Sequence, residues 1–138
     1  ARDPLLGFFK LQVYADGEHV KIAGYVETDM QYQRAVMLAL NTNGVKTVDA
    51  SRVEIKKGEK PIQDLFITAV ALSKIYGLAL FDSEDPDVWS VKVETKDSIV
   101  YVTGDVDSKE TKQKVLEALK SIKDVKDVKD DVRVKPKA

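Results

Sequence analysis

The side chains that most often carry out chemistry in proteins are scarce in this chain of 138 residues. Cysteine is absent, and the single histidine, His19, falls on an outward strand position beside a turn. A metal or nucleophilic site at His19 would have to draw its other members from carboxylates alone. The sequence also contains no glycine-rich phosphate loop and no nucleophile elbow. We therefore predict a surface histidine and a protein that is not an enzyme, with no metal and no cofactor.

The segment from Asp82 to Asp87 carries four carboxylates, and carboxylate oxygens are the ligands that hard cations such as Ca²⁺ prefer. A helix–loop–helix calcium loop that starts at Asp82 needs glycine at its sixth position and glutamate at its twelfth. The chain has Asp87 and Val93 at those positions. We predict a solvated acidic turn between a helix and a strand rather than a cation site.

A basic surface is the stronger candidate for binding. The net charge of the chain is only −1, yet residues 108–138 hold ten basic and six acidic side chains. Four lysines recur there at helical spacing, opposite an apolar stripe: Lys109, Lys112, Lys120 and Lys123. They form either an ordinary solvated helix face or a contact for anionic lipid head groups, to which each lysine near the membrane adds roughly 1 kcal/mol.

Three tyrosines, Tyr14, Tyr25 and Tyr101, fall on outward strand positions where a partner or stacked bases could bind. Residues 61–107 hold nine acidic and three basic side chains, which opposes the approach of a phosphate backbone. The RNA-recognition signature with Lys/Arg-Gly-Phe is missing as well. We expect no nucleic acid partner and keep the three tyrosines as candidate contacts for lipid or for a partner protein.

The elements that position these side chains occur twice, because the chain repeats itself at a spacing of 80 residues. Without a gap, Val13 aligns with Val93 and Gly24 with Gly104, and the apolar positions between and beyond them keep their phase. Each copy predicts two strands, a helix and a third strand. In copy one, Asp16-Gly17 supplies the pair of positive φ angles that a tight hairpin turn needs.

The helix of each copy has a recognisable start. Thr28 and Gln31 form a capping box, Ser108 is the equivalent N-cap in copy two, and Asn43-Gly44 ends the first helix. The stripes predicted to face the sheets are Tyr32, Ala35, Val36 and Ala39 in copy one, and Val115, Leu116, Leu119 and Ile122 in copy two.

The strands contain two irregularities. Gly24 and Gly104 occupy inward positions between valines, where glycine packs poorly, so we expect a helix to approach closely over both. In the third strand of copy one, Val48 has even parity whereas Val53 has odd parity. One extra residue within 49–52 must be absorbed, and a β-bulge is the simplest way to keep both valines inward.

A further helix is predicted between the copies over residues 62–80, with Pro61 in its first turn. Its main stripe is Ile62, Leu65, Phe66, Ala69, Leu72 and Tyr76. Ile67, Val70 and Leu78 make the other side apolar as well. We expect that side to pack against copy one, which is too short to have a leading helix of its own, or against a second chain in a homo-oligomer. Polar residues interrupt the apolar run, so we do not expect it to span a membrane.

This organisation resembles the BON domain. The resemblance rests on the strands Val20–Val26 and Val100–Val106, each with glycine at its fifth position, on the capped helix that follows, and on the Val-Lys step before the last strand. It covers about residues 8–56 and 61–135. It implies an α+β fold of two units with the order αββαβ, each a three-stranded mixed sheet with helices on one face, the first unit lacking its leading helix.

For function, the resemblance implies a non-enzymatic binding module of the bacterial envelope that associates with phospholipid membrane surfaces and serves envelope maintenance or stress. The alternative is a protein–protein interaction scaffold without lipid binding. The partners would be an anionic phospholipid surface or envelope proteins. Because the chain begins with alanine, we expect a periplasmic or otherwise exported protein whose signal was removed, with a cytoplasmic location as the alternative.

Overall fold

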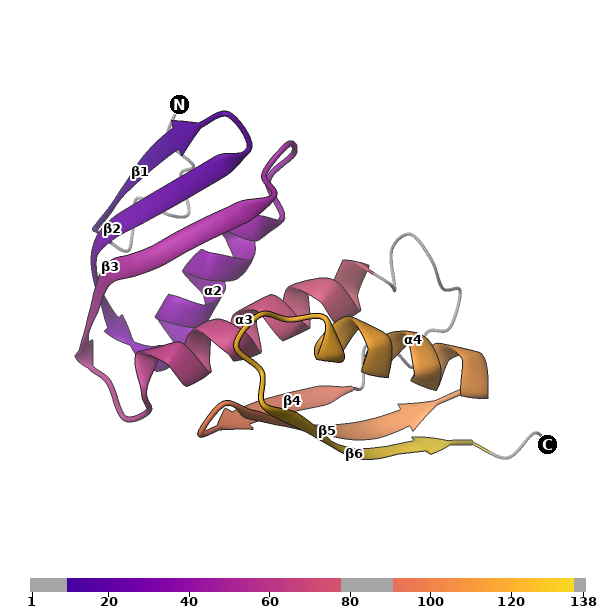
Figure 1. Cartoon of the computed structure of the whole chain (residues 1–138). Coiled ribbons are helices and arrows are strands. Elements are labelled where there is room, and N and C mark those ends of the chain that lie inside the picture. Colours follow the sequence, from indigo (N-terminus) through magenta and orange to yellow (C-terminus); the bar gives the residue numbers. More distant parts are fainter. Residues whose placement is uncertain (1–9, 78–90, 136–138) are drawn as a thin grey trace. The chain divides into compact units, whose positions relative to one another are not determined.

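The computed structural model describes residues 10–77 and 91–135 and contains two separate three-stranded sheets (Figure 1). The chain divides into two units, residues 1–69 and 70–138, and the division falls within helix α3 (Ile62–Gly77). Each unit is considered by itself below. The predicted acidic turn at Asp82–Asp87 and the predicted contact of Leu78 lie outside the described residues.

The first unit contains β1 (Leu11–Asp16), β2 (His19–Thr28), α2 (Asp29–Leu40) and β3 (Thr47–Lys57). The second repeats this order with β4 (Lys92–Lys96), β5 (Ile99–Val106), α4 (Lys109–Lys120) and β6 (Asp127–Val134). In both sheets the middle strand pairs antiparallel with the first strand and parallel with the third. The predicted α+β fold of two mixed sheets is therefore confirmed. Within the described residues, a helix leads only the second set of strands.

The duplication extends to individual hydrogen bonds. The hydroxyl groups of Thr28 and Ser108 accept from the backbone N–H three residues on, at 3.2 and 3.1 Å, and cap their helices as predicted. At the two hairpins, the carbonyl groups of Glu18 and Ser98 accept from the equivalent lysine N–H groups at 2.8 and 2.9 Å. These paired contacts show that both copies fold by the same local rules.

The hairpin turns themselves differ from the predicted pair of positive φ angles at Asp16-Gly17. The first loop consists of Gly17 and Glu18, and only Gly17 has a positive φ, +62°. In the second loop both residues, Asp97 and Ser98, have positive φ, 54° and 65°. The turn that uses two positive φ angles is thus in copy two, where neither residue is glycine.

The core of the first unit lies between its sheet and α2. The predicted helix stripe of Tyr32, Ala35, Val36 and Ala39 is buried there with the inward side chains of β2 and β3. Leu65 and Ala69 of α3 belong to the same core, and Phe66 packs against it. The predicted side of this helix was wrong, because Ile67 is buried outside that core. The part of the main stripe nearest β3, at Leu65, Phe66 and Ala69, packs on this core instead. Association with a second chain stays a prediction.

The predicted β-bulge is present in β3. Lys21 of β2 pairs with Asp49 of β3, and Ala23 pairs with Arg52. Between these two pairs β2 advances by two residues and β3 by three. The extra residue keeps Val48, Ala50 and Val53 buried. The register of β6 against β5 is uninterrupted, as the single parity of its valines predicts.

The two strand glycines adopt positive φ angles, +124° at Gly24 and +137° at Gly104. A Cβ atom on Gly24 would lie 2.4 Å from the carbonyl oxygen of Lys10 and 3.2 Å from Cα of Leu11. The predicted approach of a helix is therefore wrong at Gly24. The start of the neighbouring strand comes close instead, because the Tyr25 N–H donates to the Lys10 carbonyl group at 3.5 Å.

The partner of Tyr32 in the repeat is Lys112, and these equivalent positions have diverged. Tyr32 is 2% exposed in the first core. Lys112 forms a half-exposed ion pair with Asp130, an inward residue of β6, at 3.4 Å. Asp130 in turn takes the place of the buried Ala50 of β3. A large apolar contact in one unit corresponds to a polar one in the other.

Replacing Gly24 with alanine should lower the free energy of unfolding of the first unit by about 2–4 kcal/mol, because the new Cβ meets backbone atoms and the φ angle disfavours L residues. Gly17→Ala is the matched control: it also has a positive φ but open space around it, and should cost about 1–2 kcal/mol. Urea denaturation followed by amide NMR signals of the first unit measures both. Equal losses would contradict the contact with Lys10.

Tyr32→Ala should destabilise the first unit by about 3–5 kcal/mol, since it removes a large buried side chain. Lys112→Ala, the equivalent change in the second unit, should cost less than about 1 kcal/mol, because a half-exposed ion pair adds little. The same denaturation experiment, resolved by unit, compares the two variants. Similar losses would show that Lys112 supports its core in the way that Tyr32 does.

Candidate binding surfaces

Helix α4 lies against the second sheet through Thr111, Val115 and Leu119, all of them buried. Lys109 and Lys120 are exposed and lie eleven residues apart, which places them on one side of the helix, roughly 16 Å from each other. Half-buried Leu116 lies between them on that side, so the prediction that Leu116 faces the sheet opposite the lysines was wrong. Exposed Lys123 follows in the turn after the helix. Two of the four predicted lysines, Lys109 and Lys120, therefore flank one apolar residue, and a third follows the helix.

The fourth predicted lysine, Lys112, differs from the others because it is paired with Asp130. Within the described part of the chain, Lys109, Lys120 and Lys123 form no ion pair of this kind. We call Lys109, Leu116, Lys120 and Lys123 the α4 surface.

The three predicted tyrosines lie on two different sheets: Tyr14 and Tyr25 belong to the first sheet and Tyr101 to the second. All three are exposed as predicted, by 56%, 37% and 42%. The ammonium group of Lys56 lies over the ring of Tyr25, 4.1 Å from its centroid, in a cation–π contact. Strand alternation explains the exposure: the tyrosines point away from the face that each unit buries.

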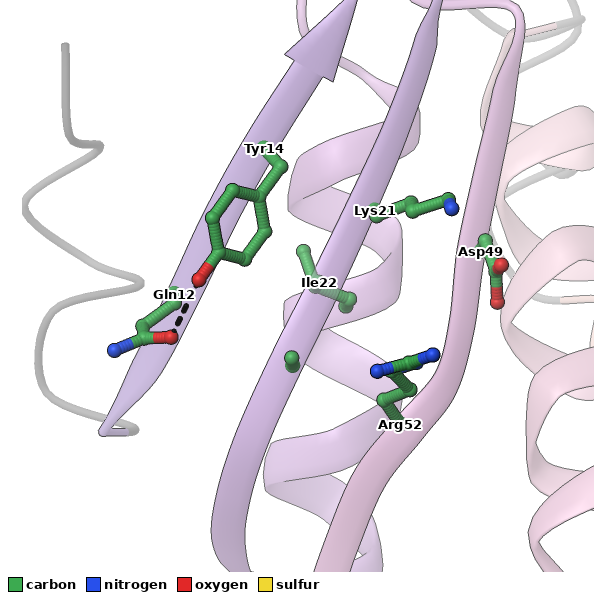
Figure 2. A pocket seen from close by; sticks show the side chains of 7 residues that line it. Gln12, Tyr14, Lys21, Ile22, Asp49 and Arg52 are labelled. Carbon is green, nitrogen blue, oxygen red and sulfur yellow. Dashed lines mark hydrogen bonds between the residues drawn. The ribbon is translucent and has the colours of Figure 1, made fainter.

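The open face of the first sheet contains a cavity of about 390 Å³ that sequence reasoning did not find. Figure 2 shows its side chains, which come from all three strands. The cavity is lined by Gln12, Tyr14, Lys21, Ile22, Ala23, Asp49 and Arg52. Only Tyr14 was a predicted site residue. The signal that could have found the rest was the bulge, because its extra residue puts Arg52 in register with outward Ala23.

Hydrogen bonds organise the polar groups of this cavity. The Tyr14 hydroxyl group donates to Oε1 of Gln12 at 2.7 Å. Oδ1 of Asp49 accepts from the backbone N–H and the hydroxyl group of Ser51, at 2.9 and 2.6 Å. These two bonds hold the pKa of Asp49 below its usual value, and the positive charges of Lys21 and Arg52 lower this pKa further. The carboxylate is thus held ionised by the bulge.

The outer edge of the second sheet is covered by its own aspartates. Because the Lys135 N–H donates to the Val106 carbonyl group, the backbone N–H groups at odd positions of β6 point toward β5. The backbone N–H groups at even positions point away from β5, to the open edge of the sheet. Two outward N–H groups, at Val128 and Val132, donate to Asp127 and Asp130 at 2.8 Å each. Such covered edges resist pairing with another strand. Binding at this edge by strand addition is therefore disfavoured.

His19 is exposed, as predicted, and its Nδ1 atom lies 2.5 Å from the hydroxyl oxygen of Thr47 on β3. The described residues contain no group of three histidine, aspartate or glutamate side chains placed to hold a metal ion. No helix in the same residues is long and apolar enough to cross a membrane.

Because the folded state lowers the pKa of Asp49, this carboxylate should stabilise the first unit above about pH 3.8, the usual value, and lose that effect as the pH falls through the lowered pKa. Asp49→Asn should therefore be less stable than the parent at pH 6, with a difference that narrows below pH 3.8. Ser51→Ala should raise the pKa of Asp49 in an NMR titration, since it removes one donor. A difference in stability that is constant from pH 2 to pH 6 would contradict this.

Two solved structures of a structural protein of the type III secretion system of Chlamydia trachomatis, CdsD, are similar to this chain. The first, of a C-terminal domain, is 18% identical with a TM-score of 0.38, and the match covers 97% of this chain and 60% of that one. The second is 19% identical with a TM-score of 0.40, covering 99% and 58%. This chain thus spans about three fifths of their length. None of the curated proteins matches it.

The sequence profile of the BON domain matches twice, over residues 1–57 and 79–136. The two matches contain the two sheets with their crossover helices, and together they take in most of the chain. They agree with the duplication seen in the hydrogen bonds. The chain belongs to the BON domain family and contains two such domains in tandem.

Proposed function

We propose that this protein is a non-enzymatic binding module of the bacterial envelope that associates with anionic phospholipid surfaces through the α4 surface. Membership of the BON family, a family of non-catalytic binding modules, supports binding as the general class of function. The observation that carries the proposal is that exposed Lys109 and Lys120 flank half-buried Leu116 on α4, with exposed Lys123 just beyond the helix. Lysines contribute attraction to anionic head groups, and a partly exposed leucine can contact the interface.

The net charge of −1 gives no general attraction to a membrane, so binding must depend on this local surface. Glu110 and Glu117, also exposed on α4, reduce its charge. The affinity should therefore be weak and strongly dependent on salt, because surface charges are screened over about 8–10 Å at physiological ionic strength. In this proposal the protein is periplasmic and serves maintenance of the envelope or its response to stress.

Co-sedimentation with vesicles tests the proposal. The protein should sediment with vesicles containing phosphatidylglycerol at low salt, dissociate near physiological salt, and ignore vesicles of phosphatidylcholine alone. The triple variant Lys109→Glu, Lys120→Glu, Lys123→Glu should lose binding. A control with the same change of charge, Lys46→Glu, Lys57→Glu, Lys60→Glu in the first unit, should keep more of it.

Failure of the parent protein to sediment with anionic vesicles at low salt would refute lipid binding by this chain. The second candidate function, a protein–protein scaffold, would then take its place. The specific observation that favours this candidate is the open face of the first sheet, where exposed Tyr14 and Tyr25 lie beside a polar cavity.

A further inference from the structure

The cavity on the open face of the first sheet has more hydrogen-bond donors than acceptors to offer a ligand. The ammonium group of Lys21 and the guanidinium group of Arg52 make no ion pair at contact distance among the described residues. The bond from Tyr14 occupies the Gln12 amide oxygen, which leaves the amide NH₂ group as a donor. A negatively charged, hydrogen-bond-accepting group is the complement of this set.

Asp49 decides which anion fits. Its negative charge interacts with both Lys21 and Arg52. With these two cations and this one carboxylate, the lining has a net charge of only +1. A carboxylate with one negative charge neutralises the lining, whereas a phosphate with nearly two would leave a negative charge uncompensated beside Asp49. The planar guanidinium group of Arg52 also suits the two oxygens of a carboxylate.

The bulge builds this arrangement in the first sheet alone. The extra residue of β3 brings Arg52 beside Ala23, whereas the uninterrupted β6 puts Asp131 beside Thr103 at the equivalent place. In the second sheet the nearby Lys129 is already paired with Asp127, at 3.1 Å. The repeats share their fold, but the juxtaposition of Lys21 and Arg52 depends on the bulge of copy one.

A second cation lies further along the same face. Tyr25 follows Ala23 by two residues on β2, a distance of roughly 6–7 Å, and carries Lys56 over its ring. Glu54, the neighbour of Tyr25 on β3, lies on the same face and offsets part of this charge, so the second contact is the weaker of the two. An extended peptide lying along β2 would bring side chains two residues apart to these two places. We propose that the open face of the first sheet binds an acidic peptide segment with carboxylates at positions i and i+2, the first of them between Lys21 and Arg52.

NMR titration of the full chain with the peptide acetyl-Glu-Ala-Glu-amide tests this inference. Amide shifts at Gln12, Lys21, Ala23 and Arg52 should move together and saturate with a Kd on the order of 1 mM. The matched peptide acetyl-Gln-Ala-Gln-amide should leave them unchanged. Arg52→Gln should weaken binding about tenfold or more, because a charge-assisted bond is lost. The control Arg34→Gln, at an exposed position of α2, should have no effect.

The absence of any localised shift up to about 10 mM peptide, tenfold above the expected Kd, would overturn the inference. Equal binding of the glutamine peptide would do the same, as would equal shifts around Tyr101 and Lys129 of the second sheet. Equal binding of inorganic phosphate would show an unselective anion site and refute the carboxylate. The spectra of each variant report folding directly, so a misfolded variant cannot imitate a loss of binding. Since the α4 surface is in the other unit, its triple lysine variant should bind the peptide unchanged, and lipid and peptide binding can fail separately.

Discussion

Both units depend on the burial of one face of a three-stranded sheet under a helix that connects two of its strands. With so little cover available, the core side chains of each strand have to point to the same side, and a slip of a strand by one residue would turn them to the solvent. The middle strands β2 and β5 meet this demand by plain alternation. In the first sheet the third strand has one residue too many, and the bulge at Ala50 and Ser51 absorbs it.

The bulge connects the demands of the core with the chemistry of the surface. By keeping Val53 inward, it makes Arg52 point outward, next to Asp49 and close to Lys21. It also places the Ser51 donors where they hold the Asp49 carboxylate. The polar cavity is therefore a by-product of an apolar constraint. This explains how one extra residue in a strand can build a surface site without any change of fold.

The repeats have diverged where the constraint is weakest. Inward positions of the middle strands are nearly the same in both, because each must fill the space under one helix. At the margin of the core, however, Tyr32 over the first sheet corresponds to Lys112 with Asp130 over the second. An inward charge at an edge strand weakens packing slightly but also discourages pairing with other chains. The second unit thus has a more polar margin and displays its lysines on α4.

The sequence by itself determined the class of fold, the duplication, the helix caps, the buried stripe of α2 and the existence of the bulge. All of these follow from periodicity and local hydrogen bonding, which act between residues close in the chain. It also placed single side chains on the correct side of a strand or helix, as at His19 and the three tyrosines. Which side of α3 covers the first sheet, and what approaches Gly24, were decided only by tertiary structure. In both cases the neighbour comes from a distant part of the chain or from backbone that carries no pattern. The same reason hid the pairing of Lys112 with Asp130 and the cavity around Arg52, since these contacts join residues up to about 40 positions apart that no local pattern relates.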